Sequence, residues 1–413
     1  MRAPAVDRQL LLGSAGLIIF GLLTLYSAGQ TDVPTRAAGV WYRQFFWVGI
    51  GIVGAWVTFH ISPRLLEWLA PALYGFSLSL LVLVLLVGTG AGTAESSHSW
   101  LSVGGHQIGQ PSELAKVATV LMLARYLSSR REPPRFLRDL LAPGLIVGTP
   151  FLLVLKQPDL GSAIVFIGIA FAMLFWAGVR PRLLFLLASP GLSLLLAFNN
   201  WAWGAWIVAF TALLFVWRPY LSDALLIWFL NVAMGAVALP LWKRLAPYQQ
   251  NRLLTFLNPE VDPRAAGYHA IQSRVAIGSG GWFGTGYTEG PQKRLAFLPE
   301  QHTDFVFPIV GEELGFVGVL LALGLFLGLF LCLLRIARRA TDSFSSLVVF
   351  GILGLLFTHV YENVGMTINL MPITGIPLPF FSYGGSFFVI CCLCLGLVFR
   401  VAYDSRQSGY PDV

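Results

Sequence analysis

Long apolar runs, separated by short polar connections, make up most of this chain. A helix needs about 20 apolar residues to cross the hydrocarbon core of a bilayer. The runs approach or exceed this length and do not alternate in polarity as strands do, so they predict helices. We predict twelve spanning helices, centred on residues 10–28, 45–61, 69–88, 112–128, 141–156, 160–178, 183–198, 202–217, 222–242, 306–334, 344–366 and 383–403.

Composition supports the membrane class. Of the 413 residues, 56% are hydrophobic and 11% are charged, and the mean hydropathy is +0.73. Soluble domains carry about 25% charged residues. The sequence therefore predicts an all-α polytopic integral membrane protein with a single membrane domain over residues 1–413. No signal-peptide cleavage pattern follows the first apolar run, which we interpret as a retained span.

The distribution of basic residues predicts the orientation. Short cytoplasmic loops of membrane proteins carry an excess of Lys and Arg. With the N-terminus inside, the cytoplasmic connections carry Arg64, Arg125, Arg130, Arg131, Arg135, Arg138, Arg180, Arg182, Arg218, Arg335, Arg338 and Arg339. The short outer loops carry Arg36, Arg43 and Lys156. We expect both termini in the cytoplasm, residues 243–305 on the outer face, and the net charge of +7 to serve contact with anionic headgroups rather than nucleic acid.

Two smaller patterns concern packing. GxxxG spacings within residues 144–148 and 324–328 predict close helix contacts. The four cysteines lie inside apolar runs and lack metal-ligand spacing, so we interpret them as small core or lipid-facing residues. They are Cys332, Cys391, Cys392 and Cys394.

The longest polar interruption covers residues 243–313. It contains no GxxxxGK[ST], HExxH or GxSxG motif, and residues 278–284 fail GxGxxG at the third glycine. His269 and His302 are too far apart in sequence to indicate a metal pair. Nucleotide, metal and hydrolase chemistry thus have no support. A polar loop beside membrane helices suits a polyprenyl-linked sugar, whose tail stays in lipid while its diphosphate and glycan meet the loop.

Ionisable residues inside spans are costly and are usually functional or paired. Glu113 and Lys116 are i,i+3 neighbours in QPSELAK, and Lys156 and Asp159 flank the turn in KQPDLGS. Each group is either an internal ion pair or a substrate contact; for Lys116 the contact would be with a lipid phosphate. Residues 372–386 contain three prolines and three glycines, so they form either the lining of a cavity or a structural kink.

Several of these runs resemble a known family. NPEVDP, GYHAIQS, AIGSGG and FLPEQHTDF resemble the SEDS membrane glycosyltransferases, and QPSELAK, KQPDLGSA, TGIPLPF and SYGGS are similar to further SEDS signatures. Glu260 beside Pro259 resembles the RodA-like branch of that family. The chain departs from the family at Ser99, where Arg is common before Trp100, and at Phe387, where a second Ser is usual.

The resemblance also marks an addition to the chain. SEDS proteins usually have ten spans, and residues 183–217 read as an extra helical hairpin turned at Asn199 and Asn200. A hairpin leaves the sidedness of all later segments unchanged. It serves either peripheral packing and lipid contact or the docking of a partner.

The resemblance implies the roles of particular residues. From its position alone, Asp262 is better explained as an Asx-turn or helix-cap residue. The resemblance reverses this, because Asp262 is the aspartate of the (N/D)PxxDP motif and is implied as the catalytic base. Asp304, likewise, is explained by position as a helix cap. The implied substrate-binding residues are Trp100, Glu113, Lys116, Lys156, Asp159, His269, Gln272, Ser273, Gln301, His302, Thr303, Asp304, Thr374 and Ser382.

No individual roles are assigned to the cations of the loop or to its last acidic pair. The cations are Arg252, Arg264, Arg274, Lys293 and Arg294. Most of them are expected to face headgroups or solvent, with one or two at a diphosphate. Glu312 and Glu313 are adjacent, so we expect at most one to point into a shared cavity.

The resemblance implies a peptidoglycan glycosyltransferase that polymerises lipid II at the outer face of the cytoplasmic membrane during cell elongation. Asp262 would deprotonate the acceptor hydroxyl, which attacks the donor's anomeric carbon as undecaprenyl diphosphate leaves. The implied partner is a class B penicillin-binding protein, a transpeptidase. The sequence identifies no definite cofactor, and a divalent cation (Mg²⁺ or Mn²⁺) would suit the diphosphate. The alternatives are a transporter that flips the same lipid and a non-catalytic cell-wall scaffold.

Overall fold

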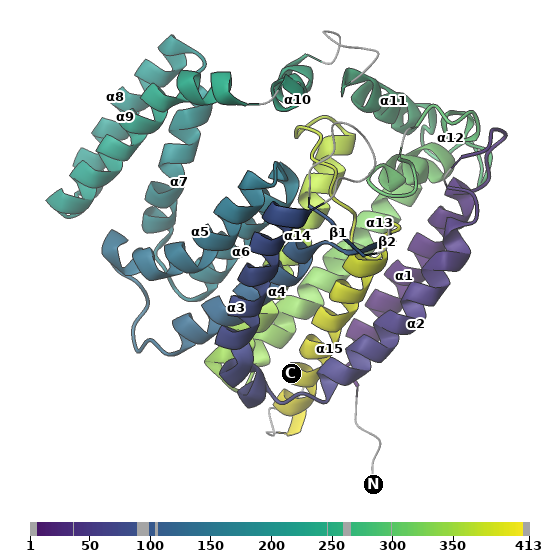
Figure 1. Ribbon diagram of the computed structural model, residues 1–413, viewed down its shortest axis with the longest axis horizontal. Helices are drawn as coiled ribbons and strands as arrows, with labels where there is room; N and C mark the ends of the chain where they lie inside the picture. The colour runs from purple at the N-terminus through teal and green to yellow at the C-terminus, as the bar shows by residue number, and fades with distance from the viewer. Residues whose placement is uncertain are drawn as a thin grey trace.

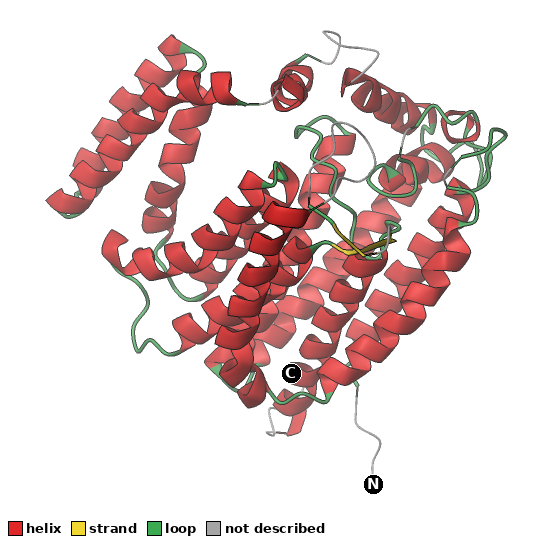
Figure 2. Ribbon diagram, viewed as in Figure 1, coloured by secondary structure: helices red, strands yellow, loops and turns green. Residues whose placement is uncertain are grey.

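The computed structural model describes residues 6–35, 37–88, 99–103, 106–245, 247–258, 266–298 and 300–407. Within these ranges the regular structure is helical apart from one pair of short strands (Figure 2). The helices are α1 (Arg8–Ala28), α2 (Val40–Phe59), α3 (Pro63–Val87), α4 (Pro111–Ser128), η1 (Leu137–Leu140), α5 (Leu141–Lys156), α6 (Leu160–Trp176), α7 (Pro181–Leu196), α8 (Asn200–Trp217), α9 (Leu221–Arg244), α10 (Pro247–Leu257), α11 (Ala266–Ser279), α12 (Pro291–Arg294), α13 (Val306–Arg339), α14 (Ser343–Thr367) and α15 (Gly385–Gln407). Strands β1 (Leu101–Val103) and β2 (His106–Gly109) pair antiparallel.

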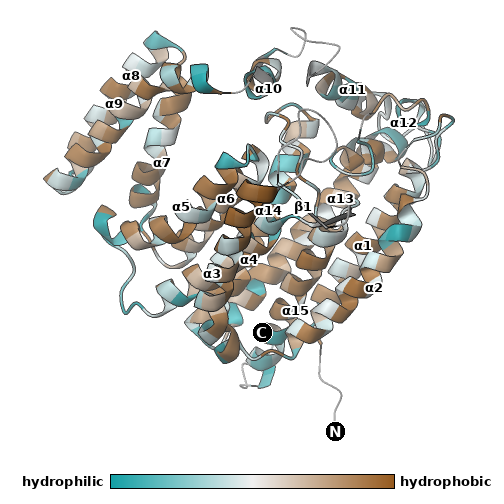
Figure 3. Ribbon diagram, in the orientation of Figure 1, coloured by the Kyte–Doolittle hydropathy of each residue, from teal (hydrophilic) through white to brown (hydrophobic). Residues whose placement is uncertain are grey.

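Helices α1 to α9 and α13 to α15 coincide with the twelve predicted spans, with ends that differ by a few residues. By length and composition, 8 helices in the described residues qualify as membrane spans, and α6 and α7 are shorter apolar helices. Apolar residues dominate the lengths of these helices and polar residues gather near their ends (Figure 3). The prediction of a polytopic all-helical membrane protein is confirmed. The strand pair before α4 is a small exception that the apolar pattern did not predict.

Helix α14 lies at the centre of the bundle (Figure 1). It packs against α4, α6, α13 and α15, while α1 packs on α13 and α2 on α15. Helices α10 to α12 lie at one end of the bundle, and the start of α1 and the end of α15 lie toward the other (Figure 1). There the buried carboxylate of Asp7 pairs with Arg335 at 2.8 Å and with Arg406 at 2.9 Å. This arrangement fits an even number of spans.

Glycines bring α6 and α14 together. A Cβ atom at Gly168 would lie 2.0 Å from Thr358 Oγ1, and one at Gly354 would lie 2.5 Å from Ala172 Cβ. The predicted GxxxG contacts are not formed, because a Cβ at any glycine of residues 144–148 or 324–328 would meet no described atom within 4 Å. Those helix faces turn away from neighbouring helices, so the prediction at these two spacings was wrong.

The predicted hairpin of residues 183–217 is present as α7 and α8. Asn199 caps α8, since its side chain accepts hydrogen bonds from the backbone N–H groups of Trp201 and Ala202. Helices α7, α8 and α9 pack on one another and stand to one side of the main bundle (Figure 1). Asn231 of α9 joins them, because its amide donates to Ser189 Oγ at 2.9 Å and accepts from Trp206 Nε1 at 3.1 Å.

The polar segment before α13 is fastened to that helix at a break. Gly315 has φ 64° and ψ −160°, which interrupts the helical hydrogen bonding of α13. The backbone N–H groups of Phe316 and Val317 donate instead to the carbonyls of Gly281 and Trp282, at 2.9 and 3.2 Å. The single span predicted for residues 306–334 is therefore two helical pieces joined at this break.

A buried ion pair completes this attachment. Lys293 Nζ lies 2.6 Å from Glu313 Oε1, and both side chains are at most 2% exposed. Glu312 accepts from the backbone N–H of Gln292 at 2.7 Å. Both glutamates thus contact the same segment, which wraps the first turns of α13. The expectation that at most one of them points into a shared cavity is not contradicted by these contacts. Lys293 is fully buried, so it is not one of the solvated cations of the loop.

We predict that Lys293→Met destabilises the protein by about 3–5 kcal/mol, because it leaves the buried Glu313 carboxylate unpaired. The control is the adjacent exposed pair of Arg294 and Asp32, whose loss through Arg294→Gln should cost about 0–1 kcal/mol. Thermal unfolding of the purified protein in detergent measures both changes. Equal effects of the two variants would contradict a special contribution from the buried pair.

Candidate functional site

The turn between α5 and α6 places Asp159 at the start of α6. Its Oδ1 accepts from the backbone N–H of Ser162 at 3.0 Å, and Gln110 Nε2 donates to its Oδ2 at 2.6 Å. Asp159 therefore links the N-terminal ends of α4 and α6. Lys156 is exposed and forms no ion pair with Asp159, so the paired arrangement considered from the sequence is absent. The turn at Pro158, with φ 28°, separates the two side chains.

Lys116 of α4 is 2% exposed and contacts α14. Its Nζ lies 3.2 Å from Nε2 of His359, and His359 Nδ1 lies 3.2 Å from the carbonyl of Pro377. An ammonium group only donates, so Nε2 accepts from Lys116 while Nδ1–H donates to Pro377. This chain of contacts assigns a neutral imidazole with its proton on Nδ1. Lys116 is thus held by the protein itself.

Unpaired acceptors surround Lys116. Glu113 and Glu362 lie close enough to interact with its charge, and they are 5% and 0% exposed. Glu113 Oε2, both carboxylate oxygens of Glu362 and the Asn363 Oδ1 have no hydrogen-bond partner. Leaving a buried polar group unpaired costs about 1–3 kcal/mol. The cluster therefore has more acceptors than donors, and it is suited to a ligand or waters that donate hydrogen bonds.

Asn363 joins this cluster to two other segments. Its Nδ2 donates to the carbonyl of Asp304 at 2.9 Å and to that of Ile376 at 2.7 Å. The irregular run of residues 372–384 is packed inside the protein, with Leu378 and Phe381 fully buried. Its expected non-helical character is confirmed.

The two predicted residues in or beside this run have local contacts. Thr374 Oγ1 lies 3.9 Å from Met366 Sδ, and a Cβ at Gly161 would lie 3.0 Å from Thr374 Cβ. Thr374 thus faces the start of α6, next to Asp159. Ser382 Oγ accepts from the backbone N–H of Leu378 at 2.7 Å, so it closes a turn.

The segment before α13 brings four predicted residues to the same end of the bundle. Gln301 Nε2 donates to the carbonyl of Ala28 at 2.9 Å, and the His302 carbonyl accepts from the backbone N–H of Tyr383 at 2.8 Å. Thr303 Oγ1 donates to the Glu300 carbonyl at 3.3 Å. These contacts hold the segment between α1 and the irregular run.

Asp304, the last of the four, has a carboxyl group with a raised pKa. Burial raises the pKa of its carboxyl to about 7, and the charges of Glu300 and Asp159 act in the same direction while Arg252 opposes them. Its Oδ2 lies 3.2 Å from where a Cβ at Gly375 would stand, and Gly375 has φ 74°. Asp304 is therefore near both the irregular run and the cluster around Asp159.

Helices α10 and α11 are both anchored at the end of α14. Ser273 Oγ of α11 donates to the Thr367 carbonyl at 2.6 Å, and Asn369 Nδ2 donates to the Phe256 carbonyl of α10 at 3.3 Å. His269 packs on Phe305 with ring centroids 5.4 Å apart, and burial lowers the pKa of its imidazole. Gln272 is half-buried on α11.

The structure leaves some predictions open. Asp262, between α10 and α11 in the sequence, lies outside the described residues, and its role stays a prediction. Trp100 is half-buried at the strand pair. Sequence reasoning missed His359 and Glu362, although two ionisable residues at i,i+3 in the apolar run 344–366 are a signal of the kind that marked Glu113 and Lys116.

Known proteins are similar to this chain over nearly its whole length. The family model described as cell cycle protein (FtsW, RodA, SpoVE) matches residues 8–214 and 195–407. This chain belongs to that family, the SEDS proteins. Peptidoglycan glycosyltransferase RodA of Treponema pallidum (strain Nichols) is 36% identical, over 97% of this chain and 98% of its own length.

Two solved structures are similar to this SEDS protein over its whole length. One, titled "Structural coordination of polymerization and crosslinking by a peptidoglycan synthase complex", matches with a TM-score of 0.71 and 31% identity, covering 99% of each chain. The other, Thermus thermophilus rod shape determining protein RodA with one aspartate replaced by alanine, matches with a TM-score of 0.64 and 29% identity, again over 99% of each chain.

Substitution of His359 tests the contact between Lys116 and His359. We predict that His359→Leu destabilises the protein by about 3 kcal/mol, because the buried ammonium loses its acceptor. His359→Gln, which keeps an acceptor, should retain most of the stability. The control His60→Leu changes an exposed histidine directly after α2 and should shift stability by about 0.5 kcal/mol or less. Thermal unfolding in detergent distinguishes these outcomes, and equal loss in both His359 variants would exclude the proposed contact.

Asp304 predicts a pH dependence of stability. Its folded pKa of about 7 is above the ordinary value of 3.8, so the folded state binds the proton more tightly than the unfolded state. Stability from this group is therefore present at low pH and is lost as the pH rises towards 7. Because Asp304 is only partly buried, Asp304→Asn should stabilise the protein by about 1–2 kcal/mol at pH 8 and by much less at pH 4.

Unfolding temperatures at pH 4, 6 and 8 measure this difference. Glu300→Gln serves as the companion variant, since loss of its charge lowers the pKa of Asp304 without removing the Asp304 carboxyl. A stability gain from Asp304→Asn that is independent of pH would contradict the assignment.

Proposed function

We infer that this chain is a peptidoglycan glycosyltransferase, a lipid II polymerase acting during cell elongation. The observation that carries the inference is the match to RodA, named a peptidoglycan glycosyltransferase, at 36% identity over 97% of this chain. The structure supports it with a polar segment attached to buried polar groups of membrane helices. We propose that this segment faces the outside of the cytoplasmic membrane, with both termini in the cytoplasm.

We propose Asp262 as the general base. It would deprotonate the 4-hydroxyl of the acceptor GlcNAc, which attacks the anomeric carbon of the donor MurNAc with inversion. The bond from that carbon to the diphosphate breaks, and undecaprenyl diphosphate leaves. The anchoring of α10 and α11 at Thr367 and Asn369 supports this role, because the intervening sequence contains Asp262.

We propose that the acceptor-rich cluster around Lys116 binds hydrogen-bond donors of the substrate. Hydroxyl and amide groups of the sugars supply such donors, whereas a diphosphate supplies acceptors and negative charge. Glu113 and Glu362 offer no positive charge to a diphosphate, and the ammonium of Lys116 already contacts His359. This proposal replaces the earlier expectation that Lys116 meets the phosphate.

The diphosphate would lie nearer the loop. The charge of Arg252 lowers the pKa of both Asp304 and His269, so it lies within electrostatic range of the segment before α13. We propose Arg252 as a cation that stabilises the leaving diphosphate. Lys293 is less suited, because its side chain is fully buried against Glu313.

A divalent cation would add to this stabilisation. No group of three or more His, Cys, Asp or Glu side chains in the described ranges converges as a metal site. Mg²⁺ is usually held by one or two carboxylates together with substrate phosphates. The carboxylates of Glu300 and Asp304, close enough to interact, fit that pattern. A bound ion would neutralise charge on the diphosphate.

The similarity to a chain in a solved complex suggests a partner protein. The structure of a peptidoglycan synthase complex that coordinates polymerization and crosslinking contains a chain similar to this one. We propose that this chain likewise works with a class B penicillin-binding protein, which would supply crosslinking.

Polymerisation of purified lipid II tests the function. The protein is assayed with its penicillin-binding partner, whose active-site serine is inactivated. Asp262→Asn should lower the rate by about 10²–10⁴-fold, the usual contribution of a general base. The matched control, Asp32→Asn, removes an exposed carboxylate and should leave the rate unchanged.

Equal rates from wild type and Asp262→Asn would exclude Asp262 as the base. If neither wild type nor Asp262→Asn formed glycan strands, but lipid II crossed the membrane of liposomes, the interpretation as a transporter would replace the interpretation as a polymerase. If neither activity were found, a scaffold would be favoured. Comparable expression and unfolding temperatures of the variants are required for each conclusion.

A further inference from the structure

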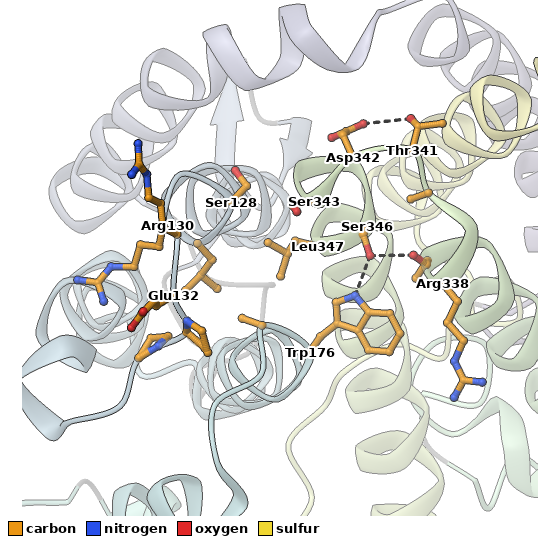
Figure 4. Close-up of a pocket in the computed structure, with 17 residues that line it drawn as sticks. Ser128, Arg130, Glu132, Trp176, Arg338, Thr341, Asp342, Ser343, Ser346 and Leu347 are labelled. Atoms are coloured by element: carbon orange, nitrogen blue, oxygen red, sulfur yellow. Dashed lines mark hydrogen bonds between the residues drawn. The ribbon is translucent and has the colours of Figure 1, made fainter. Parts of the chain in front are cut away.

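A cavity in the described structure lies away from the site above. It has a volume of about 650 Å³ and is formed where α4 and α6 end, α13 ends and α14 begins (Figure 4). The loop and Asp304 precede the first residue of α13, whereas the cavity lies at its last residues. The piece of α13 after the break at Gly315, residues 316–339, alone spans about 35 Å. The cavity is therefore separate from the proposed catalytic site and lies near the opposite membrane face.

The inner wall of the cavity is fixed by contacts between helices. Trp176 Nε1 donates to Ser346 Oγ at 2.8 Å, and Ser346 Oγ donates to the Ala337 carbonyl at 2.7 Å. The Trp176 ring stacks on Phe350 with centroids 4.2 Å apart. This wall joins α6, α13 and α14. The cavity is thus built by packed spans rather than by a loop alone.

Polar and charged groups lie around this wall. Ser128, Trp176 and Leu347 face the interior of the cavity, while the side chains of Arg130 and Arg338 extend to its two sides (Figure 4). Arg131 is also among the lining residues. In the described part of the chain, neither Arg131 nor Arg338 forms an ion pair.

The acidic residues of the lining already have partners. Asp342 caps α14, where its Oδ1 accepts from the backbone N–H of Ser345 at 2.8 Å. Glu132 pairs with Arg135 at 3.4 Å. The three arginines of the lining therefore give the cavity an excess of positive charge that its own carboxylates do not neutralise.

The position of the cavity indicates the kind of ligand. Leu331 is two turns before Arg338 on the same face of α13 and is 56% exposed, as expected of a lipid-facing side chain. Arg338 thus stands between the apolar face of α13 and the polar membrane surface. Basic pockets between spans on the cytoplasmic side bind anionic lipid headgroups. A cavity of 300–1,000 Å³ suits a small-molecule ligand.

We propose that this cavity binds the headgroup of an anionic phospholipid. The phosphate would interact with Arg130 and Arg131 and the glycerol region would lie against Trp176 and Leu347, while the acyl chains stay in the bilayer. Binding would join the ends of α4, α6, α13 and α14 and so stabilise the bundle on the face opposite the loop. The proposal does not depend on the proposed polymerase activity.

The test uses the full-length protein in a neutral detergent. Short-chain phosphatidylglycerol and phosphatidylcholine are titrated separately, and binding is followed by the rise in unfolding temperature and by native mass spectrometry. We expect tighter binding of phosphatidylglycerol. Arg130→Gln/Arg131→Gln should weaken it about 10-fold or more. The control, Arg180→Gln/Arg182→Gln, removes the same charge from a basic connection outside the cavity and should leave the affinity unchanged.

Three outcomes would overturn the proposal. Equal affinity for the two lipids would exclude recognition of the anionic headgroup. Equal loss of affinity in the two double variants would indicate general surface charge rather than this cavity. Inorganic phosphate that stabilises the protein as well as phosphatidylglycerol does, and competes with it, would assign a free-anion site. None of these results involves lipid II, so they are distinguishable from failure of the polymerase.

Discussion

The contact between the Lys116 ammonium and His359 is the interaction on which the centre of this structure depends. Both groups are shielded from bulk solvent, because Lys116 is 2% exposed and His359 is fully buried. A buried charge requires compensation, so α4 and α14 must keep the register that brings these side chains together. The packing of α14 against α6 through Gly168 and Gly354 then follows at van der Waals contact. The central helix is thereby fixed on two sides.

The same helix face fixes the position of the polar segment. Asn363 is one turn from His359 and donates to the carbonyls of Asp304 and Ile376. One amide thus holds the start of α13 and the irregular run of residues 372–384 together. The Lys293–Glu313 pair and the hydrogen bonds at Gly315 attach the preceding segment to α13. The polar segment that the sequence predicts as a loop is therefore attached to spanning helices by specific contacts.

The two ends of the bundle present different chemistry. At the loop end, carboxylates and amides outnumber the available donors, which suits hydroxyl-rich sugars. At the other end, arginines outnumber the unpaired carboxylates around a cavity of about 650 Å³. Helices α13 and α14 extend to both ends. The acceptors proposed to bind a glycan and the arginines proposed to bind a lipid phosphate thus lie at opposite ends of α13 and α14.

The sequence alone determined the spans, since a run of apolar residues can bury its backbone polar groups in a bilayer only as a helix. It also marked Glu113, Lys116 and Asp159, because ionisable residues are conspicuous in apolar surroundings. It did not predict that Lys156 and Asp159 separate, nor that the glycines of residues 144–148 meet no helix. Spacing along a chain does not say which face of a helix meets a neighbour.

Only the tertiary structure decided which distant residues meet. His359 is 243 residues from Lys116, and Lys293 is 266 residues from Ser27, whose hydroxyl it contacts. Such pairings depend on the order in which helices pack, and no local pattern encodes that order. The break of α13 at Gly315 is similar, because backbone hydrogen bonds from residues 281–286 complete it. Local polarity therefore fixed the elements, and long-range packing fixed the site.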